Sequence, residues 1–225
     1  MAAGIAHEIR NPLSGINIYL TTLGKILQST INHTDEDKVS QILSQLQSAS
    51  NKIESVIKRV MDFSRPGEPN FVLTNINHPI TEAFNLSSVT LRKSGIQMTT
   101  NLFPDLPKCS VDPQMIEQVI LNLINNAAEA MQDMDIAKKI IISSFSENNS
   151  ACISVSDSGP GIGKELRNQI FDPFYTTKSN SSGIGLSICH RIISDHSGSL
   201  ELANSESSGA AFIIKLPFSR DTDKK

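Results

Sequence analysis

Apolar residues in the first part of the chain recur at alternating steps of four and three, the spacing of a heptad pattern. This row comprises Ile9, Leu13, Ile16, Leu20, Leu23 and Leu27. After the polar stretch 30–37, two further rows keep a seven-residue step: Val39, Leu46, Ile53 and Val60, and Ile42, Ala49, Val56 and Phe63. The pattern predicts a hairpin of two helices. Because one hairpin leaves each seam half covered, we expect two chains to pair as a four-helix bundle.

The pattern changes after "FSRPGEPN" (63–70), where two prolines and a glycine end the second helix. Strands are predicted at 71–77, 96–102, 139–145, 151–157, 198–204 and 210–217, and helices at 78–93, 113–132 and 183–196. Because strands and helices mix without strict alternation, an α/β sandwich is expected, with one sheet covered by helices. The predicted domains are 1–65 (helical), 66–70 (linker) and 71–218 (α/β), followed by a tail at 219–225.

Composition narrows the function classes. The 225 residues are 39% hydrophobic, enough for a core, and the net charge of −3 argues against a nucleic-acid partner. Three widely spaced cysteines form no C-x-x-C pattern, so a cytoplasmic setting is expected and no disulfide framework. No apolar run is long enough to cross a membrane, and we expect this fragment to make no membrane contact. The short segment before His7 suggests a piece of a longer protein, whose membrane anchoring stays open.

The stretch "GIAHEIRNPLSG" (4–15) places polar residues at the start of the first helix. In the heptad register His7 and Asn11 fall on positions that face water. One interpretation is an ordinary surface histidine. The other is a reactive imidazole exposed to a reaction partner. Pro12 favours this interpretation, because a proline inside a helix costs about 3 kcal/mol, and such a cost is easier to understand at a functional site.

Two later stretches carry candidate ligand-binding residues. Asp112-Pro113 starts a helix whose buried stripe comprises Ile116, Val119, Ile120, Leu123, Ile124, Ala127 and Met131. On it, Asn122 and Asn126 lie four residues apart on a common face, where two amide oxygens suit Mg²⁺ bound to phosphate. The alternative is a wet helix face carrying two asparagines.

The glycine-rich stretches are "DSGPGIG" (157–163) and "SSGIGLSI" (181–188). The first matches neither the dinucleotide fingerprint nor the Walker pattern, and a simple tight turn is the alternative to a ligand loop. In the second, Gly183 and Gly185 open a helix whose free N–H groups favour phosphate. Between them, "FDPFYTTK" (171–178) brings aromatic residues beside Lys178, and a polar tract follows with the composition of a mobile lid.

Taken in order, "HEIRNPL", "NLINNAAEA", "DSGPGIG", "FDPFYTTK" and "SGIGLSI" resemble the H, N, G1, F and G2 boxes of bacterial sensor histidine kinases. The linker "DFSRP" and the short lid resemble the nitrogen-regulation type. The resemblance covers nearly all of residues 1–218. It implies a dimerisation and phosphotransfer hairpin, followed by an ATP-binding domain of the gyrase and histidine-kinase superfamily.

By position, the resemblance makes His7 the phosphoacceptor, Glu8 its general base and Asn11 the residue that positions water for dephosphorylating a partner. It assigns Mg²⁺ to Asn122 and Asn126. It assigns ATP to Asn126, Asp157, Gly159, Gly161, Lys178, Gly183, Gly185 and Leu186, with Asp157 recognising adenine. The implied activity is autophosphorylation of His7, then transfer to an aspartate of a response-regulator receiver domain.

Two positions depart from the pattern: Ser181 stands where another glycine is common, and Glu129 where a basic or amide side chain is common. A third comparison separates classes, because ATP-hydrolysing relatives such as gyrase carry a glutamate where this chain has Asn122. A stand-alone ATPase would need that carboxylate to activate water. A nucleotide-binding phosphatase and a non-catalytic dimeric scaffold remain as alternatives.

Overall fold

The structure is a computed structural model. It describes residues 12–23, 25, 39, 41–51, 53, 68–177, 183–203 and 209–218. The chain divides into two compact units: residues 1–66 with 176–184, and residues 67–175 with 185–225.

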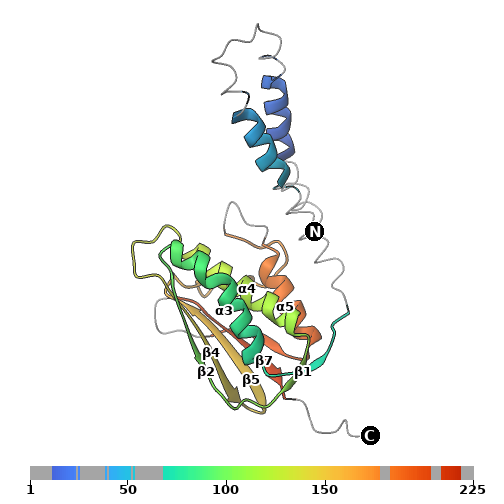
Figure 1. Cartoon of the computed structure of the whole chain (residues 1–225), viewed down its shortest axis with the longest axis vertical. Coiled ribbons are helices and arrows are strands. Elements are labelled where there is room, and N and C mark those ends of the chain that lie inside the picture. The colour runs from blue at the N-terminus through green and yellow to red at the C-terminus, as the bar shows by residue number, and fades with distance from the viewer. Residues whose placement is uncertain are drawn as a thin grey trace. The chain divides into compact units, whose positions relative to one another are not determined.

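In the first unit, residues 12–23 and 41–51 are helical, as the heptad pattern predicts (Figure 1). In the second helical segment the predicted seam is the less exposed face: Ile42 is buried, and Val39, Leu46, Ala49 and Ile53 are half-buried. The first segment splits its seam. Ile16 and Leu23 are half-buried, whereas Leu13 and Leu20 are 45% and 51% exposed. A single chain therefore covers Ile16 and Leu23 better than the alternate seam positions Leu13 and Leu20. Other predicted seam residues lie outside the described residues: Ile9, Leu27, Val56, Val60 and Phe63.

The second unit is a two-layer α/β sandwich, as predicted (Figure 1). Its five-stranded sheet has the order β2 (Gln97–Leu102), β4 (Lys139–Glu147), β5 (Ser150–Asp157), β7 (Ala211–Pro217) and β6 (Ser199–Leu202). Only the β2–β4 pair is parallel among these neighbours. A separate antiparallel pair joins β1 (Val72–Thr74) and β3 (Cys109–Val111). The helices α3 (Asn77–Lys93), α4 (Pro113–Ala130) and α5 (Gly185–Asp195) cover one face of the large sheet.

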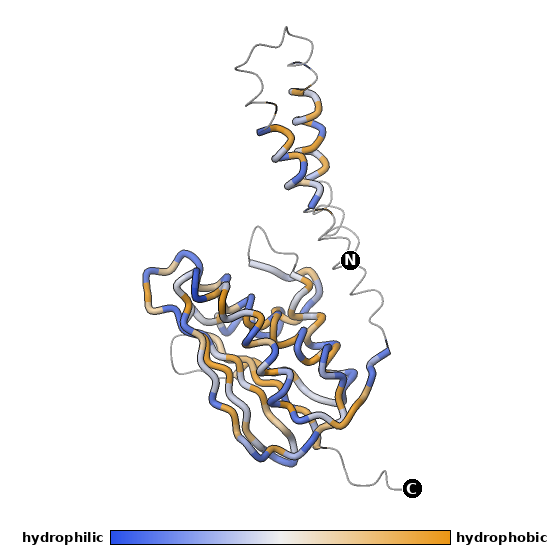
Figure 2. Tube along the Cα trace, in the orientation of Figure 1, coloured by the Kyte–Doolittle hydropathy of each residue, from blue (hydrophilic) through white to orange (hydrophobic). Residues whose placement is uncertain are grey.

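The core forms where the apolar stripes of the helices meet the inward rows of the strands. All seven residues predicted for the stripe on α4 and its end are buried. The helix lies against β4 and β5, and inward residues of the sheet such as Ile142, Ile153 and Ile214 are fully buried. Hydrophobic and hydrophilic stretches alternate along α3 and the helices of the first unit (Figure 2). Each fully buried Ile or Leu stabilises the fold by about 1.5–3 kcal/mol.

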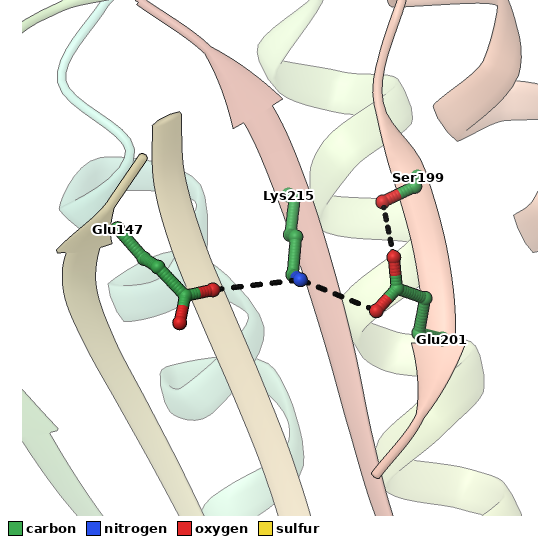
Figure 3. Close-up of polar contacts among 4 residues, drawn as sticks. All are labelled: Glu147, Ser199, Glu201 and Lys215. Carbon is green, nitrogen blue, oxygen red and sulfur yellow. Dashed lines mark hydrogen bonds and ion pairs between the residues drawn. The ribbon is translucent and has the colours of Figure 1, made fainter. Parts of the chain in front are cut away.

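The sheet face away from the helices carries polar residues. Nζ of Lys215 on β7 lies 3.4 Å from Oε2 of Glu147 and 3.2 Å from Oε2 of Glu201, and Ser199 donates to Oε1 of Glu201 at 3.0 Å (Figure 3). The hydrogen bond from Ser199 and the contact with Lys215 lower the pKa of Glu201. This cross-strand network suits a face that meets water.

The predicted helices and strands are confirmed, with two differences that concern the short strands β1 and β3. The strand expected at 71–77 is limited to Val72–Thr74, because the chain turns into α3 at Asn77. The strand β3 was not predicted from the sequence. It has three residues and pairs with β1 in antiparallel register.

Candidate functional site

The site is organised by α4, whose start is fixed by Asp112. Its carboxylate caps the helix: Oδ1 accepts from the backbone N–H of Gln114 (3.0 Å) and Met115 (3.2 Å). Oδ2 accepts from the N–H of Asn70 at 2.9 Å, while the Asp112 N–H donates to Nε2 of the buried His196 at 2.9 Å. The segment before β1, the start of α4 and the residue after α5 therefore meet at one aspartate.

Further along α4, Asn122 and Asn126 are both half-buried. Asn122 lies beside the start of α5: a Cβ built on Gly185 would be 3.6 Å from Asn122 Oδ1 and 3.9 Å from its Cγ. The structure therefore brings Asn122 and Gly185 together. Leu186 follows in the first turn of α5, where backbone N–H groups have no partner within the helix.

Asp157 ends β5 and is the best-defined polar group of the site. Its Oδ1 accepts from the N–H of Gly159 at 2.7 Å and of Ala210 at 3.2 Å. Burial raises the pKa of this carboxyl, and these two hydrogen bonds oppose the rise. Among the described residues, the hydrogen bonds to this carboxylate all use Oδ1, so Oδ2 can accept from a ligand donor such as an exocyclic amine.

The loop after Asp157 is held by a glycine that sequence reasoning missed. Gly209 has φ +114°, and a Cβ there would overlap the carbonyl oxygen of Asp157. Gly161 has φ +75°, and a Cβ there would lie 3.0 Å from the Gly209 carbonyl oxygen. Only glycine allows these three backbone segments to approach so closely. The sole signal was the glycine directly before the last predicted strand.

Helix α4 runs past both the loop after Asp157 and the start of α5. Positions for a Cβ on Gly159 are 3.4 Å from Met131 Cγ and 3.7 Å from Ala130 Cβ, at the end of α4. Asn122 is eight residues earlier, which is about 12 Å along a helix rising 1.5 Å per residue. The Asp157 end and the Gly185 end of the site are thus spaced along α4, with Asn126 between them.

Phe171, in the aromatic segment 171–178, packs against α5 and β7. The Phe171 ring centroid is 5.5 Å from that of His190 and 6.3 Å from that of Phe212. Gly183, two residues before α5, has φ +65°. Four predicted site residues, His7, Glu8, Asn11 and Lys178, lie outside the described residues, as does Ser181. Glu129, the other departure from the family pattern, is exposed.

The residues fit a hard divalent cation that keeps part of its water shell. Asn122 presents Oδ1 toward the start of α5, and Asn126 lies one turn further along α4. Amide oxygens are hard ligands that suit Mg²⁺ when phosphate and water complete its coordination. Within the described ranges no cluster of three His, Cys, Asp or Glu residues forms a competing metal site.

Comparison with protein families matches two patterns to this chain. Residues 1–69 match the His Kinase A (phospho-acceptor) domain, and residues 111–220 match the histidine kinase-, DNA gyrase B- and HSP90-like ATPase. Among curated proteins, the signal transduction histidine-protein kinase AtoS of Escherichia coli (strain K12) is 32% identical over 96% of this chain and 34% of its own length. The chain thus spans about a third of that relative.

Two solved structures extend the comparison. The catalytic domain of histidine kinase ThkA is 36% identical with a TM-score of 0.60, covering 67% of this chain and 99% of that one. ThkA in complex with the response regulator protein TrrA is 31% identical with a TM-score of 0.74, over 97% of this chain and 61% of that one. In the part of this chain that the structure describes, none of the helices has the length and apolar character of a membrane span.

Proposed function

This chain belongs to the sensor histidine kinases, and from that premise we propose that it phosphorylates itself on His7 with ATP and passes the phosphoryl group to a response regulator. The observation that carries the proposal is the Asp157 carboxylate, anchored by two backbone N–H groups at one end of α4, while Asn122 meets the start of α5 further along.

Adenine recognition is assigned to Asp157. Because Gly159 and Ala210 occupy Oδ1, Oδ2 keeps its acceptor capacity for the exocyclic amine of the base. Gly161 and Gly209 keep the backbone close to this carboxylate and hold the loop in place. The base end of ATP would then lie at the end of α4.

The triphosphate would lie toward the start of α5. There Gly183, Gly185 and Leu186 supply backbone N–H groups and the positive end of the helix dipole. Asn122 and Asn126 would hold Mg²⁺, and Lys178 would add a cation. When bound, Mg²⁺ neutralises charge on the transferring phosphoryl group.

Transfer to His7 needs no water-activating carboxylate on α4. Asn122 stands where ATP-hydrolysing relatives carry glutamate, so water is not activated and an external acceptor is favoured. Glu8 would accept a hydrogen bond from one imidazole nitrogen of His7, which would leave the other nitrogen as the nucleophile and stabilise the charge that develops on the ring.

The chain is proposed to act as a homodimer through residues 1–65. Leu13, Leu20 and Leu43 are exposed by 45–51% in the single chain, although Leu13 and Leu20 belong to the predicted heptad seam. A second copy would cover these side chains and complete a four-helix bundle.

The partner that consumes the phosphoryl group is proposed to be a receiver domain, in keeping with the ThkA–TrrA complex. Asn11 would position water for the reverse task, removal of phosphate from the regulator. Because ATP and such regulators are cytoplasmic, we place the activity in the cytosol.

Transfer to a receiver domain tests the proposal. The chain is labelled with γ-labelled ATP and Mg²⁺, freed of nucleotide, and mixed with a receiver or with its phosphoacceptor Asp→Ala variant. We expect label to move to the receiver and not to the variant. Absence of label, together with loss of phosphate from a prephosphorylated receiver, would instead identify a phosphatase.

A further inference from the structure

Ser158 stands between Asp157 and Gly159, and its hydroxyl joins this turn to the start of β4. The Ser158 Oγ accepts from the backbone N–H of Lys139 at 2.9 Å and donates to the carbonyl of Ala137 at 2.8 Å. The Ser158 N–H donates to the Lys139 carbonyl at 3.1 Å. The regular pairing of β4 with β5 ends at Asp157. The serine therefore extends the contact between these strands by one residue, with its side chain as one partner.

The Ser158 hydroxyl also meets the residue after α4. Its oxygen lies 3.3 Å from Sδ of Met131, which is fully buried and directly follows the helix. Because the single hydroxyl proton is directed to the nearer Ala137 carbonyl, the sulfur is a packing neighbour. Gly159 approaches the same methionine, since a Cβ built on it would be 3.4 Å from Met131 Cγ. The end of α4 and the segment leading into β4 thus support both residues that follow Asp157.

The opposite side of the turn is joined to the residue before β7. The Asp157 N–H donates to the Ala210 carbonyl at 2.9 Å, and the Ala210 N–H donates to Asp157 Oδ1 at 3.2 Å. Strand β5 lies between β4 and β7 in the sheet (Figure 1). The end of β5 is therefore held from both sides, by Ala210 on one side and by the Ser158 hydroxyl on the other.

We propose that Ser158 is a positioning residue that directs the Asp157 carboxylate toward the amine of adenine. One of the two N–H groups that hold Oδ1 belongs to Gly159, the residue directly after this serine. Fixing Ser158 therefore fixes that N–H, and with it the plane of the carboxylate and the direction of Oδ2. A binding group keeps its productive geometry only when the residues that support it are themselves held. The inference rests on the proposed function, because it takes Asp157 as the group that recognises adenine.

The chain offers a matched control in Ser156, two residues earlier on β5. It is half-buried like Ser158, and its hydroxyl also donates to a backbone carbonyl, that of Ile141 on β4, at 3.3 Å. Ser156→Ala therefore removes a comparable hydroxyl while the hydrogen bonds of Ser158 and Asp157 stay in place. Ser158→Thr keeps the hydroxyl, so this variant tests whether the hydroxyl itself is required.

The first measurement compares the affinity for ADP with that for purine riboside diphosphate, the analogue that lacks the exocyclic amine, at fixed Mg²⁺. The ratio of the two dissociation constants reports the contribution of the amine without any turnover. We expect Ser158→Ala to lower this ratio by about tenfold, which is the effect of one lost hydrogen bond. Ser158→Thr and Ser156→Ala should keep the ratio. Affinity for the analogue should not change, because it lacks the group that Asp157 recognises.

The second measurement needs no ligand. Amide hydrogen exchange at Lys139 and Gly159 should accelerate in Ser158→Ala, because the Lys139 N–H loses its acceptor and the Gly159 N–H loses its fixed position. Exchange in Ser158→Thr and Ser156→Ala should match the wild type at both amides. Unchanged exchange at Gly159 in Ser158→Ala would contradict the positioning role, whatever the chain binds.

The affinity ratio separates the inference from the proposed function. Wild-type protein that binds ADP no better than the analogue would overturn adenine recognition by Asp157, and the inference with it. A wild type that prefers ADP, together with the same preference in Ser158→Ala, would overturn the role of Ser158 alone. Equal losses of affinity for both ligands in Ser158→Ala would indicate a packing role and contradict the positioning role.

Discussion

At the scale of single residues, Asp157 combines a structural cost with a proposed binding role. Its carboxylate is partly buried, and burial raises its pKa. Because the folded-state pKa is raised, the ionised carboxylate disfavours folding above that pKa, and this penalty is lost as the pH falls. A group kept at such a cost is a candidate for function.

We predict that Asp157→Asn weakens ATP binding by about 10–100-fold, the loss of one charge-assisted hydrogen bond. The amide oxygen still accepts from Gly159 and Ala210, so the free energy of unfolding of the ligand-free protein should not decrease. Calorimetric titration and urea unfolding measure the two quantities. Affinity within twofold of the wild type would exclude adenine recognition by this carboxylate.

The same residue predicts a pH dependence. Wild-type ATP affinity should fall as the pH is lowered through the raised pKa of Asp157, where the carboxylate gains a proton. Asp157→Asn should lack this part of the profile. Parallel profiles in the two proteins would assign the titration to another group.

Some residues of the site are readable from local sequence, whereas others depend on contacts between distant segments. Asp157 and Gly159 stand in one short stretch, and Asn122 and Asn126 share a helix period. Gly209 is 52 positions after Asp157 in the chain, and its backbone packs closely against the carbonyl oxygen of Asp157. No local sequence pattern predicts this contact.

At the scale of elements, the cap of α4 connects three parts of the second unit. Asp112 accepts from Gln114, Met115 and Asn70, and its N–H donates to His196. The Phe71 ring lies 5.1 Å from the His196 ring. The chain therefore enters this unit beside the helix that carries Asn122 and Asn126.

We predict that Asp112→Ala lowers the free energy of unfolding of this unit by about 2 kcal/mol, since helix-cap removal alone costs about 0.5–2 kcal/mol and the Asn70 N–H also loses its acceptor. Native-state hydrogen exchange at Gln114, Met115 and Asn70 should accelerate. Asp133→Ala, at an exposed aspartate just after α4, is the matched control. Equal exchange rates in both variants would contradict the role of the cap.

Element prediction succeeded where periodicity was long. The stripe of α4 repeats over seven buried residues, and the long strands β4 and β5 alternate or carry continuous apolar residues. The strand β3 has only three residues and is formed by pairing with β1. Three residues are too few for an alternating apolar pattern to predict a strand.

At the scale of the whole molecule, the first unit leaves apolar side chains exposed that a partner chain would cover. Leu20 is 51% exposed on the predicted seam, while Ile16 and Leu23 of the other row are half-buried. The order of the two domains followed from the motifs. The strand order β2-β4-β5-β7-β6 did not, because it depends on long-range pairing that the apolar pattern leaves open.

We predict that Leu20→Glu converts the dimer to a monomer, because burying an unpaired carboxylate in the bundle is costly. Sedimentation equilibrium measures the change. Ser14→Glu, at an exposed position that the heptad register directs to water, should stay dimeric. A dimer that survives Leu20→Glu with wild-type affinity would place the interface elsewhere.

The most direct test of the central claim is the chemistry of the label that the chain takes from γ-labelled ATP and Mg²⁺. The wild type and His78→Gln, which changes an exposed histidine on α3, should acquire label that survives alkali and is lost in acid, as phosphohistidine does. His7→Gln should acquire none while binding ATP as tightly as the wild type. Label that persists in His7→Gln, or that resists acid in the wild type, would contradict phosphorylation of His7.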